Sequence, residues 1–262
     1  GAFARDPLYN CLQKRKVDVR ADVTCLLTPA QIATLSVAQI DQMLDEAFSF
    51  DNFDWQQRNR VVINEPFRAD GLNRILYRCP HCGKEGKTVG KGITLTCRNC
   101  GHAYELTETG WLKSLSGEAA FTHIPNWYAW QRGQVRRELE EGTYRLEVNV
   151  NIGMMVDYKA IYMVGSGKLI HDAEGFHLTG CDGKLDYAQK PQVHYSLYAD
   201  YYWYELADVI CLGDTQVHHF CFFQNGESVA KIRLAAEEMY KLYKSKKKPA
   251  EEKAVAPATK DI

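Results

Sequence analysis

Four cysteines stand in two matched pairs, and their spacing implies chemistry more clearly than any other feature of this sequence. The pairs are Cys79-Pro-His-Cys82 and Cys97-Arg-Asn-Cys100, each followed by a glycine. The resulting pattern, C-x2-C-x14-C-x2-C, is close to the spacing of a structural zinc ribbon. In such a ribbon each C-x2-C turn directs two thiolates at one point. The intervening hairpin then brings in the second pair, completing a tetrahedron of sulfurs about 2.3 Å from the metal.

Incidental cysteine pairs and a redox C-x-x-C are the competing interpretations of this pattern, and both are weaker. Neither accounts for two matched Cys-x-x-Cys-Gly units around a hairpin rich in Gly and Lys. Gly83 and Gly101 also stand where such a knuckle needs a positive φ to direct backbone N–H groups at sulfur. We therefore predict one zinc ion, held by the four cysteines of the pattern. Because four thiolates leave no open coordination position, this zinc would hold structure and do no chemistry.

A second pattern, H-x4-D, is formed by His177 and Asp182. Glycerolipid acyltransferases use this spacing for a general base and the carboxylate that orients it. Here the pair falls on an expected strand and a Gly-containing turn, and no Pro-Glu-Gly-Thr-Arg-like phosphate-binding segment follows, so we assign no catalytic residue. His218 and His219, beside Cys221, are adjacent on an expected strand. Adjacent strand residues point to opposite faces, so we predict one exposed and one buried histidine and no joint metal site.

Composition limits the class of protein. At 262 residues, the chain suits one or two domains with a small accessory module, and a net charge of −1 argues against a polyanion binder as a whole. Residues 74–113 carry seven Lys/Arg and three Glu, a net of +4, which suits either anionic contacts or a solvated surface. No apolar run approaches the roughly eighteen residues of a membrane span. The other cysteines are odd in number and scattered, as expected for reduced thiols in a cytosolic protein: Cys11, Cys25, Cys181, Cys211 and Cys221.

The elements around the cysteines follow from periodicity. Apolar alternation predicts a strand over residues 17–27, whose sheet would lie upstream of Gly1, and helices are expected to begin at Thr28-Pro29 and at Ser36. A helical pattern over 125–141 carries Trp127 and Trp130 near its start, for which we favour packing against a neighbouring domain over insertion into a membrane interface. Tail residues after 244 are rich in Lys, Glu, Ala and Pro and should be disordered.

Short β segments dominate residues 144–223, and an amphipathic helix is expected over 229–243. Merging the candidates leaves about seven strands, with turns expected at Gly165-Ser-Gly167, Asp182-Gly183, Gly213-Asp214 and Asn225-Gly226. The segments that we count as candidate strands are 144–152, 154–164, 168–172, 175–181, 185–189, 193–197, 201–206, 209–212 and 217–223. A meander of about seven strands closed by one helix is the layout of the PH/GRAM superfold.

Two stretches resemble a known family. Residues 1–10, the strand to Leu27, Leu-Thr-Pro-Ala-Gln-Ile (27–32) and Leu-Ser-Val-Ala-Gln-Ile-Asp (35–41) resemble the end of bacterial 1-acyl-sn-glycerol-3-phosphate acyltransferase domains. The stretch Phe-Arg-Ala-Asp-Gly-Leu-Asn-Arg-Ile-Leu-Tyr-Arg-Cys-Pro-His-Cys-Gly (67–83), with the β domain after it, resembles the C-terminal extension of some acyltransferase-family proteins of Firmicutes-type bacteria.

The resemblance implies a parent protein that moves an acyl chain from acyl-CoA or acyl-carrier protein to lysophosphatidic acid, in phospholipid biosynthesis at the cytoplasmic membrane face. The family's H-x4-D and its glycine/arginine motif for the acceptor phosphate lie upstream of the matching segment, so no catalytic residue carries over. The chain begins with Gly1 rather than Met. We expect a C-terminal portion that is inactive alone and has a regulatory or docking role.

We therefore predict an α+β chain with six parts: a remnant of the acyltransferase domain (1–30), a helical connector (31–60), the zinc ribbon (61–113), a second helical connector (118–142), a mostly antiparallel β domain with its closing helix (143–244) and a disordered tail (245–262). The expected partners are the upstream acyltransferase domain, another protein, and an anionic membrane surface.

The expected location is cytoplasmic, with weak peripheral contact to the inner membrane face through Lys84, Lys87, Lys91 and the Trp127/Trp130 face. A different class of function stays open: a free-standing zinc-ribbon adaptor that binds protein or nucleic acid. The net charge of −1 disfavours nucleic acid.

Overall fold

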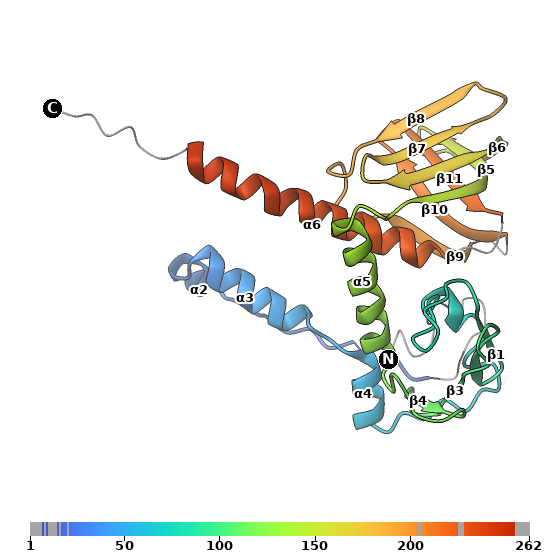
Figure 1. Ribbon diagram of the computed structural model, residues 1–262. Helices are drawn as coiled ribbons and strands as arrows, with labels where there is room; N and C mark the ends of the chain where they lie inside the picture. Colours follow the sequence, from blue (N-terminus) through green and yellow to red (C-terminus); the bar gives the residue numbers. More distant parts are fainter. Residues whose placement is uncertain are drawn as a thin grey trace.

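The computed structural model describes residues 7, 9, 15, 17–19, 21–203, 206–224 and 228–254, with side chains as far as residue 245. This part of the chain holds five α-helices and two antiparallel sheets, of four and seven strands, so the predicted α+β class is confirmed. Figure 1 shows α5 standing between the two sheets. The helices are α2 (Pro29–Thr34), α3 (Val37–Phe48), α4 (Asn52–Arg58), α5 (Ile124–Glu140) and α6 (Val229–Ala254), with a 3-10 turn, η2 (Leu72–Arg74).

The four-stranded sheet is the predicted ribbon. Its strands lie in chain order, and one face packs on a core to which α5 contributes Trp127 and η2 contributes Leu72. The strands are β1 (Thr88–Lys91), β2 (Thr94–Cys97), β3 (Ala103–Leu106) and β4 (Leu112–Ser114). Because α5 fills the ribbon's core, the region that the sequence suggested as a connector is an integral part of this module.

The seven-stranded sheet consists of two meanders, β5–β8 and β9–β11, joined by pairing of β5 with β11. Its strands are β5 (Leu146–Val156), β6 (Ala160–Asp172), β7 (Gly175–Gly180), β8 (Leu185–Gln189), β9 (Tyr198–Trp203), β10 (Ala207–Gly213) and β11 (Val217–Phe223). Helix α6 follows β11 and packs against the sheet's inner face. Seven strands and a closing helix match the expected layout, while membership of the PH/GRAM superfold stays a prediction.

The β5–β6 hairpin differs from the sequence prediction. Gly165-Ser-Gly167 is not a turn but lies inside β6, next to a register shift between Ile152 and Gly153 that bends the sheet. The chain instead reverses at Asp157 and Tyr158, both with φ +54°, a left-handed turn without the usual Gly or Asn-Gly signature. The expected strand over 193–197 is also absent. These residues cross from β8 to β9 without strand pairing.

The starts of α2 and α3 are confirmed, but their surroundings are not those expected. Thr28 and Ser36 form capping boxes with Gln31 and Gln39, which explains why the helices begin there. Neither helix buries a residue, and Figure 1 shows both projecting away from the two sheets. The strand predicted over 17–27 is wrong for residues 17–19 and 21–27, which belong to no strand of either sheet. Most of residues 1–20 lies outside the described part.

Two of the aromatic residues near the end of α3 are exposed, and the predicted tail begins as a helix. Of the aromatic residues after α3, Phe53 is buried but Phe48 and Phe50 are 79% and 63% exposed. Helix α6 continues to Ala254, so residues 245–254 are helical rather than disordered, in keeping with the high helix propensity of Ala, Glu and Lys. Residues 255–262 of the predicted tail are outside the described part. No described helix combines the length and the apolarity needed to cross a bilayer.

Candidate metal centre

The backbone closes both cysteine knuckles in the same way. In the first, the N–H of Gly83 donates to the carbonyl of Cys79 at 2.9 Å. In the second, the N–H of Gly101 donates to the carbonyl of Cys97, also at 2.9 Å. The φ angles of Gly83 and Gly101 are +70° and +75°, so each turn uses the left-handed conformation that glycine adopts without strain. The positive φ predicted for both glycines is confirmed.

The knuckles bring all four predicted cysteines to one point. The four Sγ atoms lie within 4.8 Å of one another, with 3.7 Å between Cys79 and Cys100 and 3.7 Å between Cys82 and Cys97. A tetrahedron with sulfurs about 2.3 Å from its centre has edges of about 3.8 Å. A disulfide would need about 2.05 Å. The observed spacing therefore fits a tetrahedral metal ion held by four thiolates, and no disulfide.

Without a metal, the thiols differ in acidity. Burial raises the pKa of Cys79 to about 12. Burial also opposes ionisation of Cys82, but hydrogen bonds from the Lys84 backbone N–H and the Asn99 side chain outweigh it and lower that pKa to about 7. Because a metal binds the thiolates, loading this site displaces the protons that the thiols hold. Such a closed set of four sulfurs would supply a structural link, with no open coordination position for a substrate.

Aromatic side chains form a layer behind the metal centre. The rings of His81 and His102, one from each knuckle, stack with centroids 3.4 Å apart. The Nε2 of His81 lies 2.7 Å from the hydroxyl of Tyr104, whose ring packs against Trp127 of α5. The two histidines therefore link the knuckles to each other and to the ribbon core, and they are not among the four ligand residues.

Helix α5 holds the segment that enters the first knuckle. The indole N–H of Trp127 donates to the carbonyl of Arg78 at 3.0 Å, directly before Cys79. Gln131 is fully buried and donates to the carbonyl of Ile75 at 2.8 Å, while its own carbonyl oxygen accepts the N–H of Arg78 at 3.0 Å. Sequence reasoning missed Gln131. A polar residue on the apolar face of a helix was the only available signal.

Four charged groups extend this link to the β domain. The guanidinium of Arg78 lies 2.7 Å from Glu138 of α5 and 3.3 Å from Glu85, three residues after Cys82. Lys231 of α6 lies 2.8 Å from Glu85 and 3.0 Å from Glu138. The four charges form a closed ring that joins the first knuckle, α5 and α6. Because its members come from distant parts of the sequence, spacing could not reveal it.

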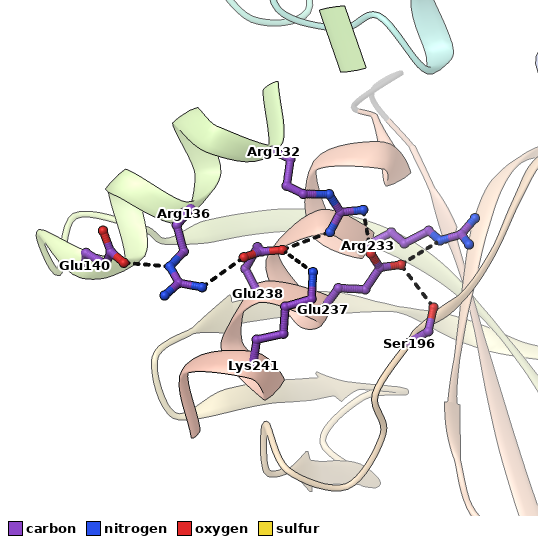
Figure 2. A network of polar contacts seen from close by, with 8 residues as sticks. All are labelled: Arg132, Arg136, Glu140, Ser196, Arg233, Glu237, Glu238 and Lys241. Atoms are coloured by element: carbon purple, nitrogen blue, oxygen red, sulfur yellow. Dashed lines mark hydrogen bonds and ion pairs between the residues drawn. The ribbon is translucent and has the colours of Figure 1, made fainter. Parts of the chain in front are cut away.

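A second ionic cluster joins α5 to α6 (Figure 2). The buried carboxylate of Glu238 accepts hydrogen bonds from Arg132 at 2.9 Å and from Arg136 at 3.1 Å, and Lys241 adds another at 2.8 Å. Arg132 also pairs with Glu237 at 2.7 Å. Burial alone would raise the pKa of Glu238, but the three cations outweigh burial and hold that pKa below its usual value. The metal module and the β domain are therefore coupled through two separate ionic contacts.

The H-x4-D pair does not assemble in the expected way. The Nε2 of His177 lies 2.7 Å from Asp186 on the neighbouring strand, while Asp182 sits in the turn after β7. His177 and Asp186 are diagonal neighbours across β7 and β8, a pairing that becomes visible only once the register is known. Both side chains are largely exposed to solvent. An exposed His–Asp pair of this kind is an ordinary surface contact.

The remaining histidines and cysteines lie only partly as expected. His219 is buried against Tyr187 as predicted, but His218, on the other face of the sheet, is half-buried rather than exposed. Cys221 is buried and burial raises its pKa, while Cys25 is exposed rather than packed. Cys181 and Cys211 are half-buried, and Cys11 lies outside the described residues.

The predicted membrane face is wrong in one part. Trp127 is 1% exposed because it fills the ribbon core, and Trp130 is half-buried with the guanidinium of Arg78 5.9 Å from its ring centre. These tryptophans therefore cannot insert together into a bilayer, and the packing alternative favoured in the sequence analysis is confirmed. The hairpin lysines Lys84, Lys87 and Lys91 are exposed, and their contact with anionic lipid stays a prediction.

Comparison with known proteins adds no family assignment. No model of a known protein family matches this sequence, and no curated protein is significantly similar to it.

Proposed function

We propose that this chain is the C-terminal portion of a glycerolipid acyltransferase-family protein, in which a zinc ion and the β domain build a docking unit without chemistry of its own. The parent would transfer acyl chains to lysophosphatidic acid in phospholipid biosynthesis. Zinc is the metal that we assign, because a closed set of four thiolates in paired knuckles suits its tetrahedral coordination and its structural role.

The lack of chemistry rests on how the candidate groups are arranged. One tetrahedral ion would saturate the four thiolates, and His177 faces a solvent-exposed carboxylate rather than a substrate cleft. The carboxylates of the two ionic clusters are neutralised by Arg and Lys partners, and both clusters join structural elements. This agrees with the resemblance, which places the catalytic motif of the family upstream of the matching segment.

The observation that carries the docking role is the exposed apolar surface of α2 and α3. We call residues 21–50 the N-terminal arm. No residue of its two helices is buried, although it exposes the following apolar side chains by more than a third of their area: Val23, Leu26, Ile32, Val37, Met43, Phe48 and Phe50. The amphipathic helix α3 buries none of its residues, and an exposed apolar helix face of this kind marks an interaction site.

Charge defines the partner of the arm further. Residues 21–57 contain six acidic residues and no Lys or Arg, in contrast to the basic ribbon: Asp22, Asp41, Asp45, Glu46, Asp51 and Asp54. A partner that covers the arm should therefore combine an apolar groove with a basic rim. In the resemblance this segment closes the acyltransferase domain, which makes that domain the partner we propose.

The coding sequence upstream of Gly1 tests the parentage. A block with H-x4-D followed by a Gly/Thr/Arg motif supports the proposal. An upstream region without this block, or none at all, contradicts it and favours the free-standing adaptor.

Docking is tested by expressing that upstream domain separately and measuring its affinity for this chain. Val37→Asp places a charge on the arm at the first residue of α3, where an acidic residue is favourable for the helix. Loss of one buried valine contact should weaken binding at least about tenfold. The control, Val62→Asp, makes the same change at another exposed valine and should leave affinity unchanged. Equal effects of the two variants would contradict docking through the arm.

A further inference from the structure

The sheet of the β domain is apolar on both faces. An antiparallel sheet with one face in solvent usually has polar side chains on that face. The inner face packs on α6 through residues such as Ile210 and Leu212 of β10. The outer face carries a separate cluster built on Val209, Phe220 and Phe222, to which no described helix contributes.

The outer face is hollowed into a trough of about 840 Å³. Its floor runs across β10, β11 and β5, where Cys211 lies opposite Phe220 and His218 lies opposite Met155. One wall is the 193–198 segment that crosses from β8 to β9, and the other is the β5–β6 hairpin with Ile161. We call this feature the outer trough. Its volume falls in the range of pockets that hold small molecules, about 300–1,000 Å³.

Polar groups gather in one part of the outer trough. His194, from the crossing segment, lies 3.4 Å from the carbonyl of Gly213, and Asp214 and His218 follow on the β10–β11 turn and β11. Tyr158 packs edge-on against His218 from the hairpin turn, where its φ of +54° is unusual for an aromatic residue. Residues held in such backbone conformations cluster at ligand clamps. The rest of the lining is mainly apolar.

The backbone of the floor decides which class of ligand fits. Strands β5, β11 and β10 are each paired on both sides, so their N–H and C=O groups are already used. A peptide lying on them would bury its own backbone groups without partners, which is costly. An aliphatic chain has no such groups, and it buries apolar surface along its whole length.

We infer that the outer trough binds a single-chain amphiphile, with the aliphatic chain along the floor and an uncharged polar head at His194 and His218. The head should be uncharged because the carboxylate of Asp214 shares this end of the trough. Backbone N–H groups of Gln216 and Val217 donate to Asp214, and these hydrogen bonds keep its pKa below the usual value. This site goes beyond the docking role proposed above and does not depend on it.

Titration of the full chain with 1-octanol, 1-decanol and 1-dodecanol, each as a monomer in solution, tests the inference by calorimetry. The dissociation constant should fall about 15-fold for every two added methylenes, since one buried methylene is worth about 0.8 kcal/mol or about fourfold in affinity. Decanoate should bind more weakly than 1-decanol at neutral pH, because its charge lies beside Asp214. Absence of binding at every chain length, or tighter binding of decanoate, would overturn the proposal.

Two neighbouring residues give matched variants. Met155 lines the outer trough, while Val156 is exposed beside it and does not. Met155→Glu should weaken 1-decanol binding by at least about tenfold, and Val156→Glu should leave it unchanged. Val193→Trp, at an exposed position of the crossing wall, provides a second blocking variant should the first unfold. Equal loss in Met155→Glu and Val156→Glu would overturn the assignment.

Two controls separate other occupants of the same surface. Sedimentation with neutral phosphatidylcholine vesicles should leave the protein in the supernatant, and centrifugation should show no dimer that Met155→Glu dissociates. Pelleting with vesicles but no binding of monomeric alkanol would overturn the proposal in favour of a bilayer surface. A dimer broken by Met155→Glu, again without alkanol binding, would overturn it in favour of a second copy of the chain.

Discussion

Replacing Gln131 with leucine removes two hydrogen bonds from the junction between α5 and the first knuckle. Gln131 is fully buried, and its amide both donates to Ile75 and accepts from Arg78. Leucine has a similar size and keeps the packing, but it leaves the Ile75 carbonyl and the Arg78 N–H without partners. Each orphaned buried group costs about 1–3 kcal/mol, so Gln131→Leu should lower the free energy of unfolding by about 2–6 kcal/mol.

The assay is urea unfolding of the metal-loaded protein, followed by tryptophan fluorescence because Trp127 lies in the same core. Release of the metal to a chromogenic chelator should also become faster, since Arg78 directly precedes Cys79. Gln134→Leu is the matched control: it makes the same change on α5 at a half-buried side chain that has no hydrogen bond to the described residues. Equal effects of the two variants on stability and metal release would refute the reasoning.

Three further outcomes follow from the same contacts. Elemental analysis of the reduced protein should give one zinc per chain, and Cys97→Ser should lose both the metal and a large part of the roughly 10–16 kcal/mol that structural zinc supplies; unchanged zinc content would contradict the four-thiolate site. Glu238→Gln should cost on the order of 2 kcal/mol at pH 7. Because the folded pKa of Glu238 lies below the unfolded one, this stabilisation is present above the unfolded pKa and disappears as pH falls through the folded pKa. The difference between wild type and Glu238→Gln in acid unfolding should therefore shrink below about pH 4, and a constant difference would contradict the ionic cluster. The chain alone should transfer no acyl groups to lysophosphatidic acid, and activity abolished by His177→Ala would place an active site in the β domain.

Local signals in the sequence were sufficient for the metal centre. The spacing of the four cysteines and the glycine after each pair define two knuckles through backbone geometry alone, and these knuckles formed as expected. The starts of α2 and α3 were also predictable, because Thr28 and Ser36 form capping boxes with residues three positions later.

Residue composition did not predict the position of one turn or the environment of one helix face, because tertiary packing determines both. Gly165 and Gly167 indicated a turn, but they relieve crowding inside a bent strand, and the true reversal uses Asp157 and Tyr158. Helical periodicity could not show whether Trp127 packs in a protein core or inserts into a membrane, because an apolar helix face suits both environments. The structure supplies the missing partner, the ribbon core.

Contacts between segments that are distant in sequence cannot be predicted from the spacing of residues. Glu85 follows the first knuckle and Lys231 lies on α6, and nothing in either neighbourhood identifies the other as its partner. Such contacts turn two modules that the sequence shows separately into one coupled unit. The N-terminal arm shows the same limit, since its apolar residues predict an apolar helix face but do not identify a partner that would cover it.

Amide hydrogen exchange of the metal-loaded and the chelator-treated protein tests the central claim most directly, that the metal centre structurally supports the contact between the ribbon and the β domain. Removing the metal should expose the knuckles and should also reduce protection in α5 and in the first turns of α6, which meet through Arg78, Glu138 and Lys231. The strands β6 to β8, which contribute no residue to this ionic contact, should keep their protection. Unchanged protection in α5 and α6 after complete loss of the metal would contradict the account.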